Sequence, residues 1–255
     1  MGGGRPLSKI VVIDHVTLDG VMQSPGRAEE DTRNGFTHGG WSSRNADDQV
    51  VSATYSRVEE GGGLQLLLGR RSYEGMLGYW NTQDSPFKEG LNNAPKYVAS
   101  RTLGGTLPWP NSTLLRGDVG DAVVELKRTL SGDLTVMGSG ELIHTLMRDD
   151  LIDEYLLFID PLVLGTGRRL FGDGSPQASL NLIETATTKT GVVIARYEAA
   201  TATRRGDCAA GPGRRRPSAS SSTSNEPSRS SWPAPVCRSS RYESRAVSFR
   251  VVCSG

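Results

Sequence analysis

Leu64-Gln65-Leu66-Leu67-Leu68 runs into Gly69-Arg70-Arg71-Ser72-Tyr73-Glu74, and Leu134-Thr135-Val136-Met137 runs into Gly138-Ser139-Gly140-Glu141-Leu142. Each stretch is an apolar run of strand length followed by glycine, a small hydroxyl residue and a helix-like pattern. A strand that passes through glycine into a helix N-terminus exposes N–H groups beside the positive end of the helix dipole. Each stretch therefore predicts an anion site, and two such sites in one domain can hold a molecule with two phosphate groups.

Arginine and hydroxyl side chains beside these turns point to a phosphorylated ligand. Arg70 and Arg71 follow the first glycine, and a guanidinium can donate two parallel hydrogen bonds to a phosphate. Ser100 and Arg101 come at the end of another short apolar run, at the sheet edge where ligands of open α/β sheets bind. The sequence predicts a dinucleotide-binding enzyme whose cofactor carries an extra phosphate.

Simpler interpretations stay open for each feature taken alone. Either glycine stretch could be an ordinary strand–turn–helix, with solvated arginines at the first, and residues 96–102 could be a surface turn. Neither stretch matches the Rossmann fingerprint, because Ile143 stands where the third glycine would follow Gly138-Ser139-Gly140. A conventional Rossmann dehydrogenase is therefore disfavoured.

Strand and helix patterns alternate along the first 200 residues. We expect strands over residues 9–16, 64–68, 96–100, 114–115, 134–137, 151–164, 180–183 and 192–197. We expect helices over residues 46–60, 70–77, 118–130 and 140–147, with Asn45 as the cap of the first and a loop through Asp84-Ser85-Pro86. This alternation indicates an α/β fold with a mixed, mostly parallel sheet flanked by helices and antiparallel strands at its C-terminal edge.

The net charge of +1 divides unevenly along the chain. Residues 201–255 hold ten Arg and no Lys against three acidic residues, a net of +7, which leaves 19 basic and 25 acidic residues in 1–200. An acidic domain lacks the electrostatic footprint of nucleic-acid binding. The Ser/Arg/Pro-rich stretch cannot bury enough apolar surface to offset its ordering entropy. We expect one domain over 8–200, without nucleic acid as a partner, and a disordered basic tail over 201–255.

The positions of the cysteines and histidines and the length of the apolar runs indicate the cellular compartment and whether a metal site or a membrane span is expected. All three cysteines lie after residue 200, so residues 1–200 contain no disulfide and no Cys-based metal site. His15, His38 and His144 are too scattered to indicate a metal site. No run approaches the ~18 apolar residues of a membrane span, and the N-terminus lacks the apolar core of a signal peptide. We expect a soluble, cytoplasmic protein without metal or membrane contact.

Asp19 is a candidate catalytic acid. It ends the first predicted strand between Leu18 and Gly20, where partial desolvation would raise its pKa and allow it to donate a proton. The alternative is a plain Asp-Gly turn. Asp47 and Asp48 lie near a helix start, where acidic residues stabilise the helix dipole.

Six motifs in order resemble the dihydrofolate-reductase-like superfamily, and within it the C-terminal reductase domain of the bifunctional riboflavin-biosynthesis deaminase/reductase. The resemblance covers about residues 8–199, and the motifs are Val16-Thr17-Leu18-Asp19-Gly20-Val21-Met22, Leu67-Leu68-Gly69-Arg70-Arg71-Ser72-Tyr73-Glu74, Tyr97-Val98-Ala99-Ser100-Arg101-Thr102, Val136-Met137-Gly138-Ser139-Gly140-Glu141-Leu142, Leu151-Ile152-Asp153-Glu154 and Pro161-Leu162-Val163-Leu164-Gly165-Thr166-Gly167-Arg168-Arg169-Leu170-Phe171. The Cys and His ligands of a zinc-deaminase half are missing from residues 1–200.

The resemblance implies an NADPH-dependent oxidoreductase that passes hydride to a small heterocyclic or sugar-imine substrate, as 5-amino-6-(5-phosphoribosylamino)uracil reductase does, and that often forms homodimers. It places the cofactor phosphates on Gly69, Arg70, Arg71 and Ser72, the adenosine 2′-phosphate at Ser100 and Arg101, and the pyrophosphate and nicotinamide over Gly138, Ser139, Gly140 and Glu141. Asp19 would lie near the nicotinamide or substrate. Asp47 or Asp48 is the nearest counterpart of the carboxylate that dihydrofolate reductases carry on the helix after their first loop, and Asp47 is the second candidate, after Asp19, for the catalytic group that polarises or protonates the acceptor. Reduction of a pterin, and nucleotide binding without catalysis, are the alternative functions.

Overall fold

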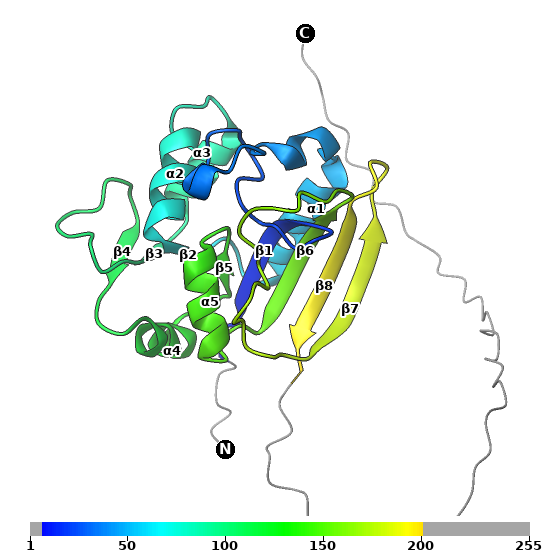
Figure 1. The fold of residues 1–255 in the computed structure, drawn as a ribbon. Coiled ribbons are helices and arrows are strands. Elements are labelled where there is room, and N and C mark those ends of the chain that lie inside the picture. The colour runs from blue at the N-terminus through cyan, green and yellow to red at the C-terminus, as the bar shows by residue number, and fades with distance from the viewer. Residues whose placement is uncertain (1–6, 201–255) are drawn as a thin grey trace, which may run out of the picture. The chain divides into compact units, whose positions relative to one another are not determined.

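The strands of the domain form one eight-stranded sheet. The computed structural model describes residues 7–200, and the sheet order is β4-β3-β2-β5-β1-β6-β8-β7 (Figure 1). The strands are β1 (Ile10–Thr17), β2 (Leu66–Gly69), β3 (Lys96–Ala99), β4 (Ser112–Leu115), β5 (Leu134–Val136), β6 (Glu154–Asp160), β7 (Leu180–Thr187) and β8 (Val193–Ala199). The strands from β4 to β6 pair in parallel, whereas β8 and β7 pair antiparallel. This arrangement confirms the predicted sheet; the predicted tail over 201–255 lies outside the described residues.

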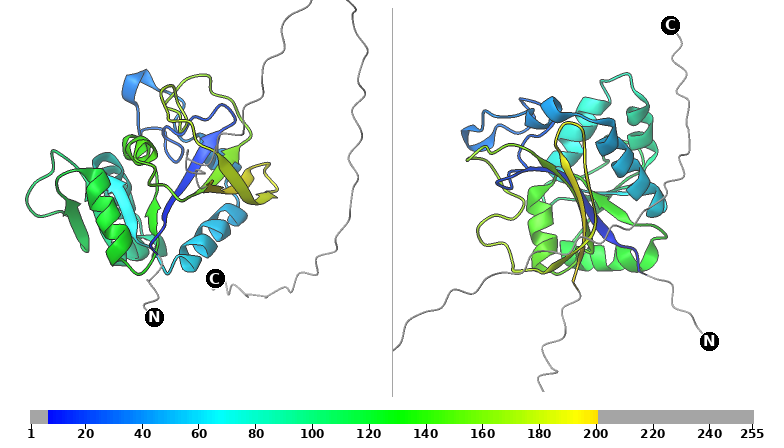
Figure 2. Two further views of the ribbon diagram at one scale, coloured as in Figure 1. Left: turned by 90° about the horizontal axis from the view of Figure 1, so that it is seen from below. Right: turned by 90° about the vertical axis from the view of Figure 1, so that its right-hand side faces the viewer.

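Helices cover both faces of this sheet (Figure 2). The α-helices are α1 (Asp48–Glu60), α2 (Arg70–Trp80), α3 (Pro86–Asn93), α4 (Val119–Thr129) and α5 (Gly140–Arg148), and two short 3₁₀ helices, η1 (Arg33–Gly35) and η2 (Trp41–Asn45), lie between β1 and α1. Helices α4 and α5 pack on one face of the sheet, while α1, α2 and α3 pack on the other. Figure 1 accordingly shows α5 in front of the central strands and α1 behind them.

Two local predictions need correction. The helix expected over 46–60 begins at Asp48, because Asp47 rather than Asn45 is its N-cap and accepts a hydrogen bond from the Gln49 N–H at 2.9 Å. The loop expected at Asp84-Ser85-Pro86 instead leads directly into α3, with Pro86 at the first helical position. Proline suits that position because the N–H that it lacks would have no helical partner.

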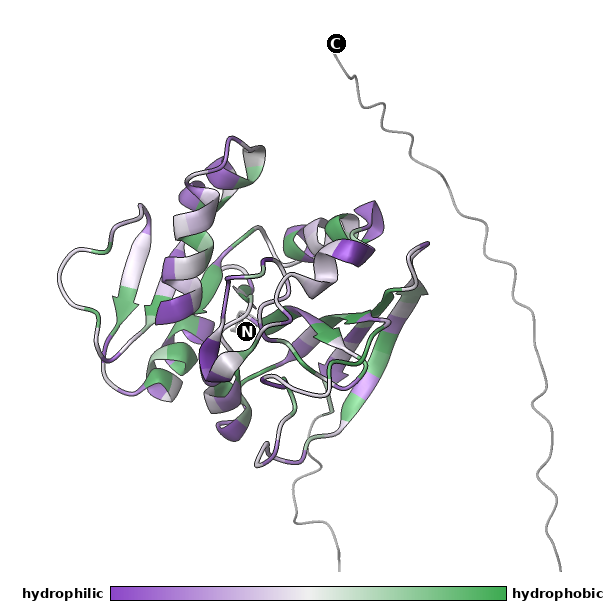
Figure 3. Ribbon diagram, turned by 45° about the horizontal axis from the view of Figure 1, so that its top comes forward, coloured by the Kyte–Doolittle hydropathy of each residue, from purple (hydrophilic) through white to green (hydrophobic). Residues whose placement is uncertain are grey.

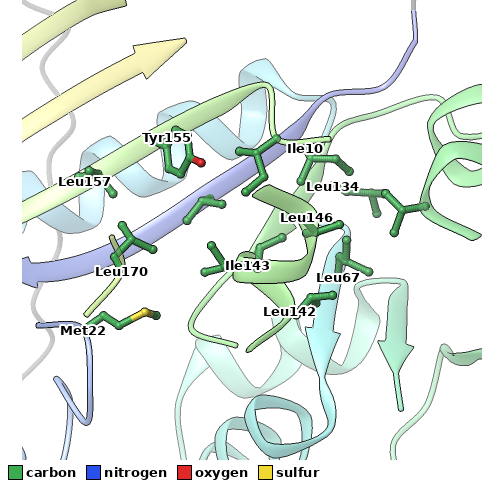
Figure 4. Close-up of a cluster of buried hydrophobic side chains, with 14 of the residues drawn as sticks. Ile10, Met22, Leu67, Leu134, Leu142, Ile143, Leu146, Tyr155, Leu157 and Leu170 are labelled. Atoms are coloured by element: carbon green, nitrogen blue, oxygen red, sulfur yellow. The ribbon is translucent and has the colours of Figure 1, made fainter. Parts of the chain in front are cut away.

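The core is organised around β1, which is buried on both faces. Ile10, Val12 and Val16 pack with Leu134 of β5 and Ile143 of α5 in a buried cluster (Figure 4). The alternate residues of β1 pack against α1 and the strands β6 and β8. Such burial explains the continuous β-branched sequence of this strand. Figure 3 shows the hydropathy of the residues along the chain. Hydrophobic positions are concentrated in the strands, and hydrophilic positions recur on the helices.

A buried ion cluster joins elements at the amino end of β6. Glu154 is fully buried and accepts hydrogen bonds from Arg57 of α1, at 2.5 Å, and from Arg196 of β8, at 2.7 Å. Arg57 also donates to Asp133 at 2.8 Å. Burial alone would raise the pKa of Glu154, but the hydrogen bonds from the two arginines lower it below its ordinary value. The cluster fixes α1 against the sheet and against the turn before β5.

Replacing Glu154→Gln should destabilise the domain strongly. Removing one partner of a buried ion pair leaves its partners buried without full compensation, at a cost of about 3–5 kcal/mol in the free energy of unfolding. Urea denaturation would measure this loss. The matched control is Glu125→Gln, which removes a surface pair with Arg128 at 4.0 Å and should change stability by less than about 0.5 kcal/mol. Equal effects of the two substitutions would contradict the structural role of the cluster.

Candidate functional site

The two glycine turns meet at the carboxyl edge of the sheet, because β2 and β5 are neighbours. Gly69, the N-cap of α2, donates its N–H to Oγ of Ser139, the N-cap of α5, at 2.9 Å. Gly138 and Ser139 both have left-handed backbones, with φ of 61° and 65°. A Cβ on Gly138 would lie 3.2 Å from the Ser72 hydroxyl oxygen. The N-termini of two helices, which attract anions, therefore lie side by side at this edge.

The carboxyl group of Asp14 lies beneath the second glycine turn. Its Oδ1 accepts a hydrogen bond from the Gly138 N–H at 2.9 Å, and its Oδ2 is buried without a hydrogen-bond partner among the described residues. Burial raises the pKa of Asp14 to about 8, opposed by the Gly138 hydrogen bond and assisted by the charge of Glu30. Asp14 is thus a neutral acid at pH 7. Sequence reasoning missed it, although an acidic residue inside a β-branched strand was the available signal.

Substituting Asp14→Asn should change how stability depends on pH. Asp14 loses its proton near pH 3.8 in an unfolded chain and near pH 8 in the folded protein. Between these values the folded state holds the extra proton, so this group lowers the free energy of unfolding as pH rises, by up to about 1.4 kcal/mol per pH unit. Asparagine lacks this titration. Urea unfolding would measure the free energy of unfolding of both proteins at pH 5 and pH 8. The difference, variant minus wild type, should be larger at pH 8 than at pH 5. An equal difference at the two pH values would contradict a neutral Asp14.

The predicted residues after β2 and β3 come together on the surface. Arg70 donates to the Glu74 carboxylate and to the Thr102 hydroxyl, both at 2.9 Å. The Ser100 hydroxyl accepts hydrogen bonds from the N–H groups of Thr102 and Leu103 at 3.2 and 3.0 Å. Arg70 therefore connects α2 to the turn after β3, and its charge is partly satisfied by Glu74.

Two exposed arginines flank this bridge. Arg71 is the second residue of α2, and Arg101 follows Ser100 in the turn after β3. Within residues 7–200 neither guanidinium forms an ion pair, in contrast to Arg70. These two side chains are the positive charges available to a ligand beside the first glycine turn.

Asp19 binds the loop that follows β6 through its carboxylate. Its carboxylate accepts hydrogen bonds from the Thr17 hydroxyl at 2.6 Å, the Leu164 N–H at 3.1 Å and the Gly165 N–H at 2.8 Å, and it lies 3.4 Å from the Arg169 guanidinium. Partial burial raises its pKa, but these hydrogen bonds outweigh burial and lower the pKa of Asp19 to about 2. The expectation of a raised pKa is therefore wrong, because the loop supplies donors that stabilise the charged form.

Glu141 and Gln23 hold the same loop from the other side. Glu141, in the first turn of α5, forms an ion pair with Arg168, which lowers the pKa of Glu141. The Gln23 side chain accepts from the Arg168 N–H at 3.0 Å and donates to the carbonyls of Asp31 and Arg33. The predicted site residues Asp19 and Glu141 thus both position the loop that follows β6.

Asp47 has a local structural role, because its carboxylate caps α1. Among residues 7–200 no three His, Cys, Asp or Glu side chains are placed to hold a metal ion together. The helices in that part of the chain are all too short or too polar to cross a bilayer.

Known proteins resemble this chain in sequence and fold. The family model of the RibD C-terminal domain matches residues 9–194. The protein named uncharacterized protein YyaP from Bacillus subtilis (strain 168) is 31% identical over 134 residues, which are 50% of this chain and 70% of that protein.

Two solved structures share the fold at low identity. A pyrimidine reductase-like protein from Corynebacterium diphtheriae has a TM-score of 0.53 at 12% identity, covering 76% of this chain and 92% of its own. A diaminohydroxyphosphoribosylaminopyrimidine deaminase/5-amino-6-(5-phosphoribosylamino)uracil reductase from Thermotoga maritima has a TM-score of 0.50 at 14% identity, covering 76% of this chain and 57% of its own. With the family match, these similarities confirm the dihydrofolate-reductase-like fold expected from the sequence.

Proposed function

Because the chain belongs to the RibD C-terminal domain family, we propose that it is an NADPH-dependent reductase that acts on a small heterocyclic or sugar-imine substrate. The substrate class is that of 5-amino-6-(5-phosphoribosylamino)uracil reductases. The observation that carries the proposal is the junction of the two glycine turns, where the Gly69 N–H meets the Ser139 hydroxyl. Homodimer formation and a cytoplasmic location stay predictions.

The charge distribution at this edge suits an anionic cofactor. Two glutamates of the helices that begin at this edge are each paired with an arginine, Glu74 of α2 with Arg70 and Glu141 of α5 with Arg168. The carboxyl group of Asp14, closest to the second turn, is neutral at pH 7. No uncompensated negative charge from these three groups therefore opposes a phosphate bound at the helix N-termini.

In this proposal each sequence-predicted group has a role toward the cofactor. The first turn of α2, with Gly69, Arg70, Arg71 and Ser72, binds one phosphate, and Gly138, Ser139, Gly140 and Glu141 form the surface beneath the pyrophosphate and nicotinamide. Ser100 and Arg101 lie where the 2′-phosphate binds. Bound NADPH supplies a hydride, while the protein positions the cofactor and the substrate. Asp14 supports the Gly138 turn from below.

The proposal predicts a preference for NADPH over NADH. A charged hydrogen bond to the 2′-phosphate should favour NADPH by about 1.5–3 kcal/mol, and Arg71→Ala and Arg101→Ala should each reduce this preference. The matched control is Arg128→Ala, which removes an exposed arginine from the end of α4. Titration followed by nicotinamide fluorescence would measure both affinities.

The possible failures of this titration have different meanings. Equal affinities of the wild type for NADPH and NADH would show that the arginines are assigned wrongly. A loss of preference in the Arg128→Ala control would mean that the effect is general to surface charge. Absence of binding to either nucleotide would overturn the reductase proposal and favour a different use of the fold.

A further inference from the structure

His15 and Asp160 form a hydrogen-bonded pair at the carboxyl ends of the adjacent strands β1 and β6. His15 Nδ1 lies 2.9 Å from Asp160 Oδ2, and Asp160 Oδ1 accepts a hydrogen bond from the Asn45 side-chain amide at 3.1 Å. The Asp160 side chain is fully buried, whereas that of His15 is 28% exposed. A buried carboxylate of this kind fixes the orientation and the tautomer of an imidazole.

The surrounding residues hold the pair in place. The His15 ring packs against the ring of Phe158 at 5.0 Å and against the edge of Trp41 at 6.5 Å, measured between centroids. The Trp41 indole donates to the Gln23 carbonyl at 2.8 Å. The Thr190 hydroxyl, in the β7–β8 turn, donates to the Asn45 carbonyl at 3.0 Å. Elements distant in sequence thus support one imidazole, as a catalytic group requires.

The imidazole has one nitrogen left for a ligand. Nδ1 is engaged by Asp160, and within residues 7–200 Nε2 makes no hydrogen bond to the protein. His15 directly follows Asp14 on β1, so the two side chains leave opposite faces of the strand at the same sheet edge. The imidazole therefore lies one residue along the strand from the carboxyl group that supports the Gly138 turn.

We propose that His15 is the general acid of the reductase and that Asp160 is its positioning residue; this inference rests on the proposed function. Reduction of a C=N or C=O group adds a hydride to carbon and a proton to nitrogen or oxygen. NADPH supplies the hydride. The His15 imidazolium supplies the proton through Nε2–H, becomes neutral, and regains a proton from solvent.

The other acids at this edge are unsuited to that step. Asp19 is ionised at pH 7 because the loop after β6 donates hydrogen bonds to it. Asp14 holds a proton, but it is 7% exposed and lies under the Gly138 turn, out of reach of a substrate. Among the three, only His15 combines a partly exposed side chain, at 28%, and a ring nitrogen without a hydrogen bond within residues 7–200 with an orientation fixed by a buried carboxylate.

The test compares variants in NADPH-dependent reduction of 5-amino-6-(5-phosphoribosylamino)uracil. In His15→Asn the side-chain amide can still donate to Asp160, so the fold is preserved while Nε2 is removed. We expect kcat to fall by about 10²–10⁴-fold, the usual contribution of general acid catalysis, with unchanged NADPH affinity. His38→Gln, which alters an exposed loop histidine, is the matched control and should keep wild-type kcat.

The test of Asp160 as a positioning residue is which nitrogen of neutral His15 carries the proton, because a purely structural role would not change that. Nitrogen-15 NMR of labelled histidine should show neutral His15 with its proton on Nδ1 in the wild type. In Asp160→Asn the proton should move to Nε2 or be shared, and kcat should fall to a value between those of the wild type and His15→Asn. A wild-type His15 protonated on Nε2 would overturn the positioning role.

The outcomes separate this inference from the function on which it rests. Full kcat in His15→Asn, with active wild type, would overturn the general-acid role and leave the reductase proposal standing. A wild type that binds NADPH but does not reduce the uracil would overturn the proposed substrate, and with it this inference. A fall in kcat matched by an equal fall in NADPH affinity would show a binding role instead of proton donation.

Discussion

The parallel pairing of β2, β5, β1 and β6 brings the carboxyl ends of four strands to one edge of the sheet. Each of these strands ends in a turn at that edge, so residues that are distant in the sequence form hydrogen bonds there. The pairs are Gly69 with Ser139, Asp14 with Gly138, and His15 with Asp160. The last pair is separated by 145 positions in the chain. Without a common strand direction these groups would be divided between two edges, and neither a cofactor nor a substrate could contact them together.

Two buried carboxyl groups, Glu154 at the amino end of the sheet and Asp14 near its carboxyl end, differ in their charge. At the amino end, Glu154 is charged and paired with Arg57 and Arg196, which makes it costly to alter. At the carboxyl end, Asp14 has no cationic partner among residues 7–200 and is neutral at pH 7. This difference has a physical reason. An ionised Asp14 beneath the Gly138 turn would repel the anion that the helix N-termini attract, whereas a neutral acid can support the turn without opposing it.

Sequence patterns predict most of the fold because strands and their order depend on local signals. Apolar runs ending in glycine identified β2 and β5, and the polar stretch around Gly191 identified the closing hairpin of β7 and β8. The start of α3 is also locally encoded, by Ser85 and Pro86, although the sequence pattern there predicts a loop. In each of these elements the information lies within a few residues of the element itself.

The site was less predictable because its chemistry depends on distant partners. The low pKa of Asp19 arises first from the Thr17 hydroxyl, two residues away, and then from backbone donors at Leu164 and Gly165, which no local pattern connects to it. The high pKa of Asp14 arises from its burial in the central strand β1, which becomes evident only when both neighbouring strands are in place. Sequence reasoning therefore predicted the two glycine turns that the structure brings together, but it predicted the wrong direction for the pKa of Asp19 and did not consider Asp14.

The register of β1 links the cofactor site to the proposed proton donor. Val12 pairs with Val136 of β5 on one side and with Tyr155 of β6 on the other, so the strand is fixed from both directions. Asp14 and His15 follow at the next two positions and leave opposite faces. A slip of one residue would exchange those faces, taking the neutral acid from the Gly138 turn and the imidazole from Asp160. The register of the central strand thus positions both the support of the Gly138 turn and the His15–Asp160 pair.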